Sequence, residues 1–269
     1  MDLASALPAL VPALCALAEA AGQAIADIEA RLDPAAAQLP DKADHTPVTL
    51  ADLAAHRVIA QGLAALPLAL PLVSEEDSAS HRHALPDAFW LVDPLDGTRE
   101  FMARNGEYTV NIALVQHGVP IWGVVHAPAL HQTFWGGAGL GAMGRTAAGL
   151  APLAVAPVPT GLQPWRVLAS RHHLDARTAA LIQRLPAHTL LQVGSSLKFC
   201  RIAQGLADLY PRFGPTSAWD TAAAQAVLEG AGGSVCDLQG APLRCQGGDW
   251  RNPAFVASAS PSGLSLASD

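Results

Sequence analysis

Apolar positions recur along the chain with two spacings, and each spacing predicts a different kind of element. Apolar residues three or four apart, bounded by capping residues or proline, are typical of helices that cover a core. Short apolar runs between Gly, Pro, Asn or Asp are typical of strands. The sequence therefore predicts helices over residues 11–32, 49–66, 175–185, 197–207 and 221–231, and strands over residues 70–73, 89–92, 108–115, 120–126, 166–170, 189–193, 209–213 and 254–258.

Glycine and proline divide this pattern. The dipeptide His117-Gly118 predicts a turn between two strands, and the Gly-rich stretch 136–149 predicts a hairpin and a loop. That stretch lacks the strand-before, helix-after setting of a dinucleotide-binding loop. Prolines crowd the span 152–164, which indicates a boundary between an N-terminal and a C-terminal subdomain.

The two subdomains are expected over residues 1–158 and 159–269. In the second of them, predicted strands alternate with predicted helices. This alternation is typical of α/β proteins built from stacked layers.

Composition narrows the class of protein. The 269 residues are 51% hydrophobic and 14% charged, which indicates a packed globular chain. The net charge of -7 argues against binding to a nucleic acid polymer, which requires a basic surface. A small anionic substrate is still allowed, because a metal ion can invert the local field. No cysteine pair forms C-x-x-C, so we expect reduced, mostly buried thiols in a cytoplasmic protein; the cysteines are Cys15, Cys200, Cys236 and Cys245.

The N-terminal segment is apolar enough to suggest a signal peptide. It carries Asp2, lacks a basic start and contains Pro8 and Pro12, which argues against that interpretation. The prolines also predict an apolar run too short and interrupted to span a bilayer. We therefore expect an amphipathic helix from Val11 to Leu32 and no transmembrane segment. A homodimer and a peripheral contact with the inner membrane are left open.

Two carboxylates follow directly on the apolar strand 89–92. Asp93 and Asp96 leave the strand on a tight turn, and Gly97 and Thr98 then present backbone N–H groups where a helix begins. At about 4 Å, two like charges repel by about 4 kcal/mol at an effective dielectric of 20. A hard cation would remove this repulsion, and oxygen ligands favour Mg²⁺, Mn²⁺ or Ca²⁺ over zinc. A capped turn without any ligand is the structural alternative.

Other acids have ordinary alternatives when each is considered alone. Glu75 and Glu76 end a predicted strand. Asp220 precedes a predicted helix, where it also suits an N-cap. Asp52 lies in the first turn of a helix whose expected N-cap is Thr49.

Taken together in this chain order, these segments resemble the magnesium-dependent, lithium-sensitive phosphatase family that includes inositol monophosphatase. The likeness extends from Lys42 to Ser258. DPLDGT with a later WD is specific for the family, while GSSLKFC and YPRFGPT resemble its 3'(2'),5'-bisphosphate nucleotidase branch. The matching segments are TPVTLAD (46–52), SEED (74–77), DPLDGTREF (93–101), RNGEYTVNIAL (104–114), GSSLKFC (194–200), LYPRFGPT (209–216) and WDTAA (219–223).

The resemblance implies a layered α-β-α-β-α sugar-phosphatase fold, of the α+β / α/β kind, and two to three Mg²⁺ ions per site. It implies that Glu76 lies behind the ligands or at the surface. The implied ligands are Glu75, Asp93 and the Leu95 carbonyl for one ion, Asp93, Asp96 and Asp220 for a second, and Glu75 through water for a third.

The resemblance also implies a catalytic arrangement. The amides of Gly97 and Thr98 would bind the scissile phosphate. The Thr98 hydroxyl, backed by Asp52, would orient and deprotonate the attacking water, and Glu75 would assist as a metal ligand. Positioning and charge neutralisation suffice for phosphoryl transfer, so no covalent nucleophile is required.

A second group of residues is expected to choose the substrate. Gly194-Ser195 opens the helix that carries Lys198, which predicts an anion or sugar-hydroxyl site, with ordinary capping as the alternative. Arg212 stands where an inositol-type enzyme has an acid, which favours a second phosphate; a surface arginine is the alternative. The strand end with Arg171 and His172 is a further candidate contact. The whole predicted substrate set is Glu75, Leu95, Asp96, Gly97, Thr98, Gly194, Ser195, Lys198, Arg212 and Asp220.

The predicted activity is Mg²⁺-dependent hydrolysis of 3'-phosphoadenosine 5'-phosphate to AMP and phosphate, with the sulfated nucleotide as a further candidate substrate. An inositol-1-monophosphatase of broad specificity is the nearest alternative. A non-catalytic Mg²⁺- or nucleotide-binding protein on the same fold is an alternative of another class. A broken Asp52–Thr98 pair would mark the last of these, and both residues are present.

Overall fold

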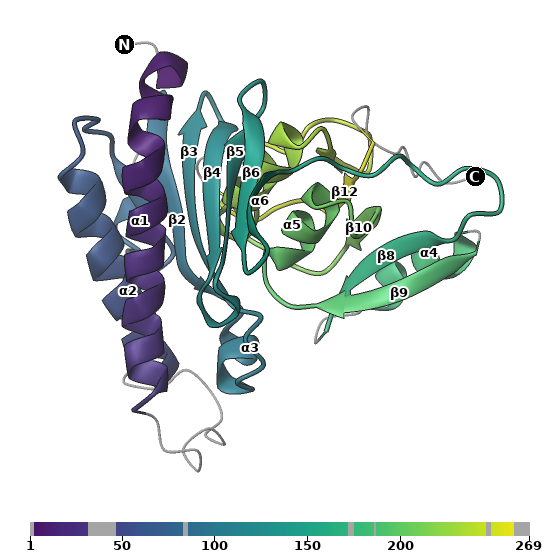
Figure 1. Cartoon of the computed structure of the whole chain (residues 1–269), viewed down its shortest axis with the longest axis horizontal. Helices are drawn as coiled ribbons and strands as arrows, with labels where there is room; N and C mark the ends of the chain where they lie inside the picture. Colours follow the sequence, from purple (N-terminus) through teal and green to yellow (C-terminus); the bar gives the residue numbers. More distant parts are fainter. Residues whose placement is uncertain are drawn as a thin grey trace.

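Two β-sheets organise the computed structural model, which describes residues 3–31, 47–82, 86–171, 175–185, 187–245 and 249–260 (Figure 1). The first sheet has the order β1-β2-β3-β4-β5-β6-β7, with β1 parallel to β2 and the other neighbours antiparallel. The second has the order β11-β12-β10-β8-β9, in which β12 runs antiparallel to both of its neighbours. The strands are β1 (Leu72–Ser74), β2 (Ala88–Asp96), β3 (Thr109–Gln116), β4 (Val119–Ala127), β5 (Gln132–Gly137), β6 (Gly141–Thr146), β7 (Gly149–Pro152), β8 (Trp165–Ser170), β9 (His188–Val193), β10 (Leu209–Arg212), β11 (Ser234–Asp237) and β12 (Phe255–Ser258).

Helices cover both sheets and fill the space between them. The first two helices pack on one face of the first sheet, the last helix and α5 lie between the sheets, and α4 covers the outer face of the second sheet (Figure 1). The layers therefore follow the predicted α-β-α-β-α order. The helices are α1 (Leu3–Glu29), α2 (Pro47–Ala64), α3 (Thr98–Met102), α4 (Ala176–Arg184), α5 (Leu197–Ala203) and α6 (Ala218–Gly230).

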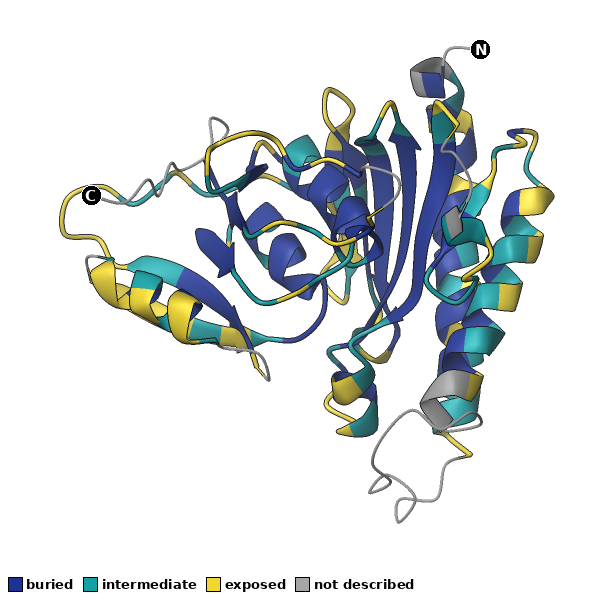
Figure 2. Cartoon of the chain, turned by 180° about the vertical axis from the view of Figure 1, so that it is seen from behind, coloured by how far each residue is buried: buried dark blue, intermediate teal, exposed yellow. Residues whose placement is uncertain are grey.

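Strands β2, β3 and β4 of the first sheet are buried on both faces along most of their length, which explains why they are largely apolar (Figure 2). Along β2, Trp90 and Val92 pack against α1 and α2, while Phe89 and Leu91 pack toward α5 and α6. Successive side chains on a strand point to opposite faces. Asp93 therefore continues the row of Phe89 and Leu91 and points into the layer between the sheets.

Several predicted boundaries were wrong. α1 begins at Leu3 rather than Val11 and contains Pro8 and Pro12, and α2 begins at Pro47, so Thr49 is not its N-cap. α6 begins at Ala218, three residues before the predicted start, because Ser217 caps it. The sequence pattern missed strand β11, which has only four residues and follows a Gly-Gly turn. It also predicted one hairpin and a loop where the structure has the three strands β5, β6 and β7.

Other predictions are confirmed. Asp175 caps α4, since its carboxylate accepts hydrogen bonds from the backbone N–H groups of Arg177 and Thr178. His117 and Gly118 both have positive φ, at 50° and 74°, in the predicted turn between β3 and β4. The polar segment 40–46 and His172 lie outside the described residues. The division into subdomains at residue 158 stays a prediction.

The apolar helix α1 is longer than the N-terminal pattern predicted. Its segment Ala6–Glu29 has 24 residues and a mean hydropathy of 1.6, so by length and composition it could cross a membrane. The expectation that this segment is too short and interrupted was wrong, because the helix continues through both of its internal prolines. Leu14, Ala18 and Ile25 are nevertheless fully buried against α2 and the first sheet, as in a core helix.

Candidate active site

A bulge at the end of β2 brings two acids to one face of the first sheet. Asp93 is paired with Asn111 and Asp96 with Thr109, so three steps along β2 match two steps along β3. In a regular strand, residues three apart point to opposite faces. The extra residue reverses this alternation, and Leu95 packs on the α1 and α2 side instead. Asp93 and Asp96 therefore both point into the layer between the sheets.

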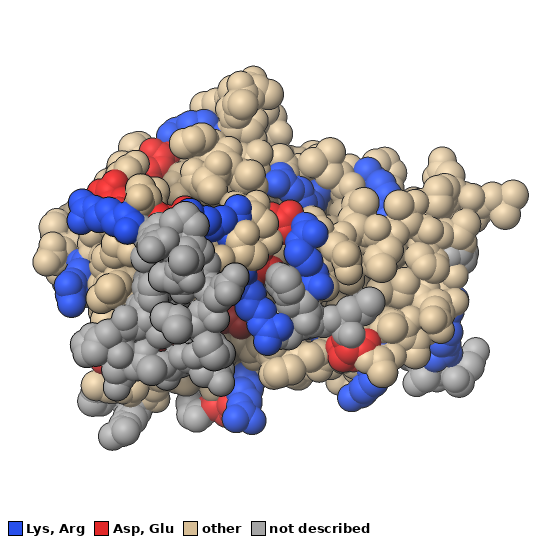
Figure 3. Space-filling view, turned by 90° about the horizontal axis from the view of Figure 1, so that it is seen from below, with Lys and Arg blue, Asp and Glu red and all other residues tan. Residues whose placement is uncertain are grey.

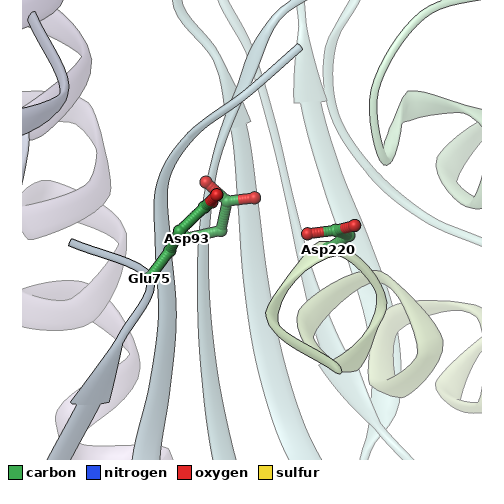
Figure 4. A group of neighbouring side chains, drawn as sticks. All are labelled: Glu75, Asp93 and Asp220. Atoms are coloured by element: carbon green, nitrogen blue, oxygen red, sulfur yellow. The ribbon is translucent and has the colours of Figure 1, made fainter. Parts of the chain in front are cut away.

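Glu75 reaches the same place from the neighbouring strand. β1 runs parallel to β2, with Ser74 paired to Val92, and the Glu75 N–H donates to the carbonyl of Val92. Parallel strands bring their carboxyl ends to the same edge of a sheet. Glu75 and Asp93 are therefore neighbours in space although 18 residues separate them (Figure 4).

Asp220 approaches from the opposite side, in the first turn of α6. It is the third helical residue and not the N-cap; its Oδ2 accepts a hydrogen bond of 2.9 Å from the Ser217 N–H. One oxygen each of Glu75, Asp93 and Asp220 lies within 4.8 Å of the other two, and the three carboxylates face one another (Figure 4). Together with Asp96, these residues are called the acidic cluster below.

The electrostatics of the acidic cluster are those of crowded, buried carboxylates. Burial, followed by the charges of Glu75 and Asp96, raises the pKa of Asp93 well above its usual range. Burial and the nearby Asp220 raise the pKa of Asp96 to about 7. Burial likewise raises the pKa of Asp220 to about 7. Removing these groups from water without a counter-charge is unfavourable, so the arrangement suits a bound cation.

The donor set fits a hard divalent cation. The cluster offers carboxylate oxygens from separate elements, and the Leu95 N–H holds Asp93 Oδ1 at 3.0 Å, which orients that carboxylate. Oxygen ligands of this kind are those that Mg²⁺, Mn²⁺ and Ca²⁺ prefer. We therefore identify the acidic cluster as a candidate metal centre.

Asp52 and Thr98 flank the acidic cluster. Asp52 is buried in α2, and its charge contributes to the raised pKa of Asp93. Thr98 is the first residue of α3, directly after Gly97, whose φ of 95° is in the left-handed region. A Cβ at Gly97 would lie 3.3 Å from both Ser195 Cβ and Tyr108 Cα, so the backbone here packs closely against the C-terminal half of the chain.

That half contributes residues 194–196, called the docking loop below. The Ser196 N–H donates to Asp96 Oδ2 at 2.5 Å, and the Gly194 N–H donates to Glu107 Oε2 at 2.8 Å. An added Cβ at Gly194 would lie 2.3 Å from the side chain of Glu100, so only glycine fits at this position. The docking loop is thus attached to the first sheet at the acidic cluster.

The predicted substrate cations lie close by, and both are buried. The Lys198 ammonium donates to the carbonyls of Ser195 and Val193 and lies 5.1 Å from the centre of the Tyr210 ring; burial lowers its pKa to about 8. Arg212 donates from Nε to the Gly214 carbonyl and from Nη2 to the Pro215 carbonyl, both at 3.1 Å. Lys198 in α5 therefore also holds the segment before its helix, and Arg212 in β10 the loop after its strand.

Three further residues near the acidic cluster differ in exposure. Glu76 is half-buried, Arg99 is exposed on α3, and Glu100 is buried. Arg171 donates from Nη2 to both carboxylate oxygens of Glu107 at 3.0 Å.

Sequence reasoning missed residues that hold the acids in place. The hydroxyl of the fully buried Ser74 lies 2.9 Å from His56 Nδ1, and its carbonyl lies 2.7 Å from His81 Nε2, directly before Glu75. The His81 ring stacks on Trp219, with centroids 4.8 Å apart. A second missed group, Glu107, Thr109 and Asn111, contacts the docking loop. The alternation of polar and apolar residues in EYTVNI could have identified it.

On the face seen in Figure 3, basic and acidic side chains are interspersed. A surface that tracks a nucleic acid polymer concentrates basic side chains along one stripe. The described part of this face has no such stripe.

A layered fold with a candidate metal centre between its layers fits a metal-dependent phosphatase. The Inositol monophosphatase family matches residues 8–267, and the chain belongs to that family. The chain is 46% identical over 233 residues to 3'(2'),5'-bisphosphate nucleotidase CysQ of Shigella flexneri, covering 86% of this chain and 91% of that protein. The expected resemblance is thereby confirmed.

Solved structures of family members have the same fold as this chain. CysQ from Bacteroides thetaiotaomicron superposes with a TM-score of 0.76 at 37% identity, covering 91% of this chain and 95% of that one. An inositol monophosphatase from Anabaena superposes with a TM-score of 0.74 at 25% identity, covering 95% and 92%. The predicted layered fold is therefore confirmed.

Proposed function

We propose that the protein is a cytoplasmic, Mg²⁺-dependent 3'(2'),5'-bisphosphate nucleotidase that hydrolyses 3'-phosphoadenosine 5'-phosphate to AMP and phosphate. The observation that carries this proposal is the convergence of Glu75, Asp93 and Asp220 from β1, β2 and α6 within 4.8 Å. The substrate class is supported by the relatives that carry the nucleotidase name. The buried free cysteines are compatible with a reducing compartment.

The acidic cluster would hold two to three Mg²⁺ ions, with Glu75, Asp93 and the Leu95 carbonyl at one and Asp93, Asp96 and Asp220 at another. Bound Mg²⁺ lowers the pKa of its water and neutralises phosphoryl oxygens. Ser196 and Ser217 support this role, because their N–H groups fix one oxygen of Asp96 and of Asp220.

The remaining groups would position the phosphate ester. Gly97 and Thr98 would contact the phosphate, and the Thr98 hydroxyl would pass a proton from the attacking water toward Asp52. A P–O bond to water forms as the P–O bond to the 3' oxygen breaks, so in-line geometry is required. Gly194, Ser195, Lys198 and Arg212 would surround the rest of the nucleotide.

A phosphate-release panel tests this proposal. The full-length protein is incubated with Mg²⁺ and either 3'-phosphoadenosine 5'-phosphate, its sulfated form or inositol 1-phosphate, each with and without Li⁺. We expect the highest kcat/KM with the bisphosphate and inhibition by Li⁺. A higher value with inositol 1-phosphate would favour the broad-specificity phosphatase, and no release with any ester would favour a non-catalytic binding protein.

A further inference from the structure

One face of β3 holds the docking loop. Thr109 and Asn111 are two residues apart in β3, so their side chains point to the same side of the strand, and Glu107 lies two residues before β3 begins. Glu107 accepts from the Gly194 N–H, the Thr109 hydroxyl lies 2.9 Å from Ser196 Oγ, and Asn111 Oδ1 accepts from Ser196 Oγ at 2.8 Å. Glu107 thus holds the first residue of the docking loop, and Thr109 and Asn111 both hold its last residue.

Ser196 connects this row to the acidic cluster. Its hydroxyl is bound by Thr109 and Asn111, and its N–H donates to Asp96 Oδ2. The side chain therefore fixes where the N–H points, and the N–H fixes one oxygen of Asp96. The serine is 1% exposed, so water does not compete for these bonds.

Asn111 is placed to affect two acids at once. It is the Cα partner of Asp93 across the β2–β3 ladder, and it reaches Asp96 through Ser196. Side chains that are directly paired across a ladder lie on the same face, about 5 Å apart. Asn111 is 1% exposed, and within the described part of the chain its buried Nδ2 has no hydrogen-bond partner.

A buried amide with an unpaired N–H group contributes little to the free energy of folding. A buried donor without a partner costs about 1–3 kcal/mol, which offsets most of what the Oδ1 bond contributes. Its nearest neighbours on the same face of β3 are Ala113 and Thr109, and Thr109 contacts the same Ser196 hydroxyl. The presence of asparagine is therefore better explained by the acidic cluster than by stability.

We propose that Asn111 is a positioning residue for the metal centre, which acts through Ser196 to fix the orientation of Asp96 beside Asp93. The inference rests on the proposed function only in assigning Asp93 and Asp96 as metal ligands. Groups behind the ligands typically change metal affinity or activity by about 10–100-fold.

The test measures metal binding without substrate. Mn²⁺ is titrated into the metal-free, full-length protein and followed by electron paramagnetic resonance, with Mg²⁺ as competitor. We expect Asn111→Ala to weaken Mn²⁺ binding by about tenfold. We also expect its metal-free Tm to stay within about 4 °C of wild type, because the unsatisfied donor is removed together with the bond. A Kd within twofold of wild type would overturn the proposal.

Ser196→Ala gives an independent measurement, since it removes the hydroxyl and keeps the backbone N–H. We expect a loss of Mn²⁺ affinity similar to that of Asn111→Ala, and a double variant no weaker than the weaker single one. When two residues act through the same contact, the losses of affinity from their single variants do not add, whereas the losses from independent residues do. Additive losses would overturn the route through Ser196, and if Asn111→Ala does not fold, unchanged binding in Ser196→Ala would overturn the proposal.

Gln225→Ala is the matched control. Gln225 is a buried amide of α6 that donates to Glu229 and to the Leu243 carbonyl, away from the acidic cluster. We expect it to lower Tm and to leave Mn²⁺ affinity unchanged, which separates positioning from general stability; an equal loss of affinity in the control would contradict positioning. Asn111-dependent Mn²⁺ binding in a protein that releases no phosphate would reject the proposed function and keep this inference.

Discussion

Buried carboxylates occur in two very different settings in this protein. In the second sheet, the fully buried Asp208 is bound by a single arginine: Arg166 donates to it from its backbone N–H, from Nε at 3.0 Å and from Nη2 at 2.5 Å. In the acidic cluster, the neighbours of each carboxylate include other carboxylates.

The contrast shows how to recognise a functional acid. The Asp208 pair has its charge balanced inside the protein, and its hydrogen bonds raise the pKa of Arg166, so it stabilises the fold. The acidic cluster holds like charges close together, which is unfavourable unless a cation enters. Burial alone does not distinguish the two sites, but the identity of the neighbouring charges does.

The largest effect is expected at the acidic cluster. Asp96→Asn should lower kcat/KM for 3'-phosphoadenosine 5'-phosphate by more than about 100-fold, because it removes a proposed metal ligand. The metal-free Tm should not fall, since one repelling charge disappears. Steady-state kinetics and thermal unfolding in EDTA measure the two quantities, and activity near the wild-type value would reject the metal assignment.

Asp208→Asn should have the opposite effect, lowering the stability of the fold while leaving activity unchanged. Removing the acid leaves Arg166 without its charged partner and should cost about 2–3 kcal/mol of unfolding free energy. For a protein of this size, that corresponds to a fall in Tm of about 5–10 °C. Activity of the folded fraction at 20 °C should be retained. A variant with unchanged Tm and lost activity would place Asp208 among the functional acids instead.

A smaller effect is expected from pH in the absence of metal. The pKa values of Asp96 and Asp220 are raised to about 7 from 3.8, so the folded state binds more protons than the unfolded state between these limits. Metal-free stability should therefore be highest near pH 4, apart from other groups, and should fall as pH rises toward 7. Added Mg²⁺ should reverse this fall, because it binds only the folded form.

Differential scanning fluorimetry across this pH range, with EDTA or Mg²⁺, measures that trend. Asp96→Asn is the informative comparison, since it removes one of the carboxylates whose pKa is raised and should flatten the metal-free curve. Equal slopes in both proteins would contradict the assignment of the pH dependence to the acidic cluster.

The smallest effect is expected at a buried cation. Arg212→Ala should lower turnover of the bisphosphate by about tenfold and turnover of a monophosphate much less, if the guanidinium receives a second phosphate. Because Arg212 also holds the carbonyls of Gly214 and Pro215, Tm must be measured alongside. Equal losses on both substrates would assign it a purely structural role.

Much of the local organisation could be predicted from the sequence. The strand-end acids Asp93 and Glu75 and the Asp175 cap follow from apolar runs and capping residues, which act over a few residues. The layered order of elements was implied by the family resemblance. The extent of α1 could not be predicted, because a proline inside a helical pattern ordinarily predicts a break, and this helix continues through Pro8 and Pro12.

By itself, the sequence determined which residues carry charge at the strand ends and that these acids form a phosphatase-type pattern. Only the tertiary structure decided which of them meet. The bulge that turns Asp96 to the side of Asp93 depends on pairing with β3, and the Ser196 N–H reaches Asp96 across 100 residues. Such contacts depend on how sheets and loops pack, because no local rule of spacing connects residues so far apart.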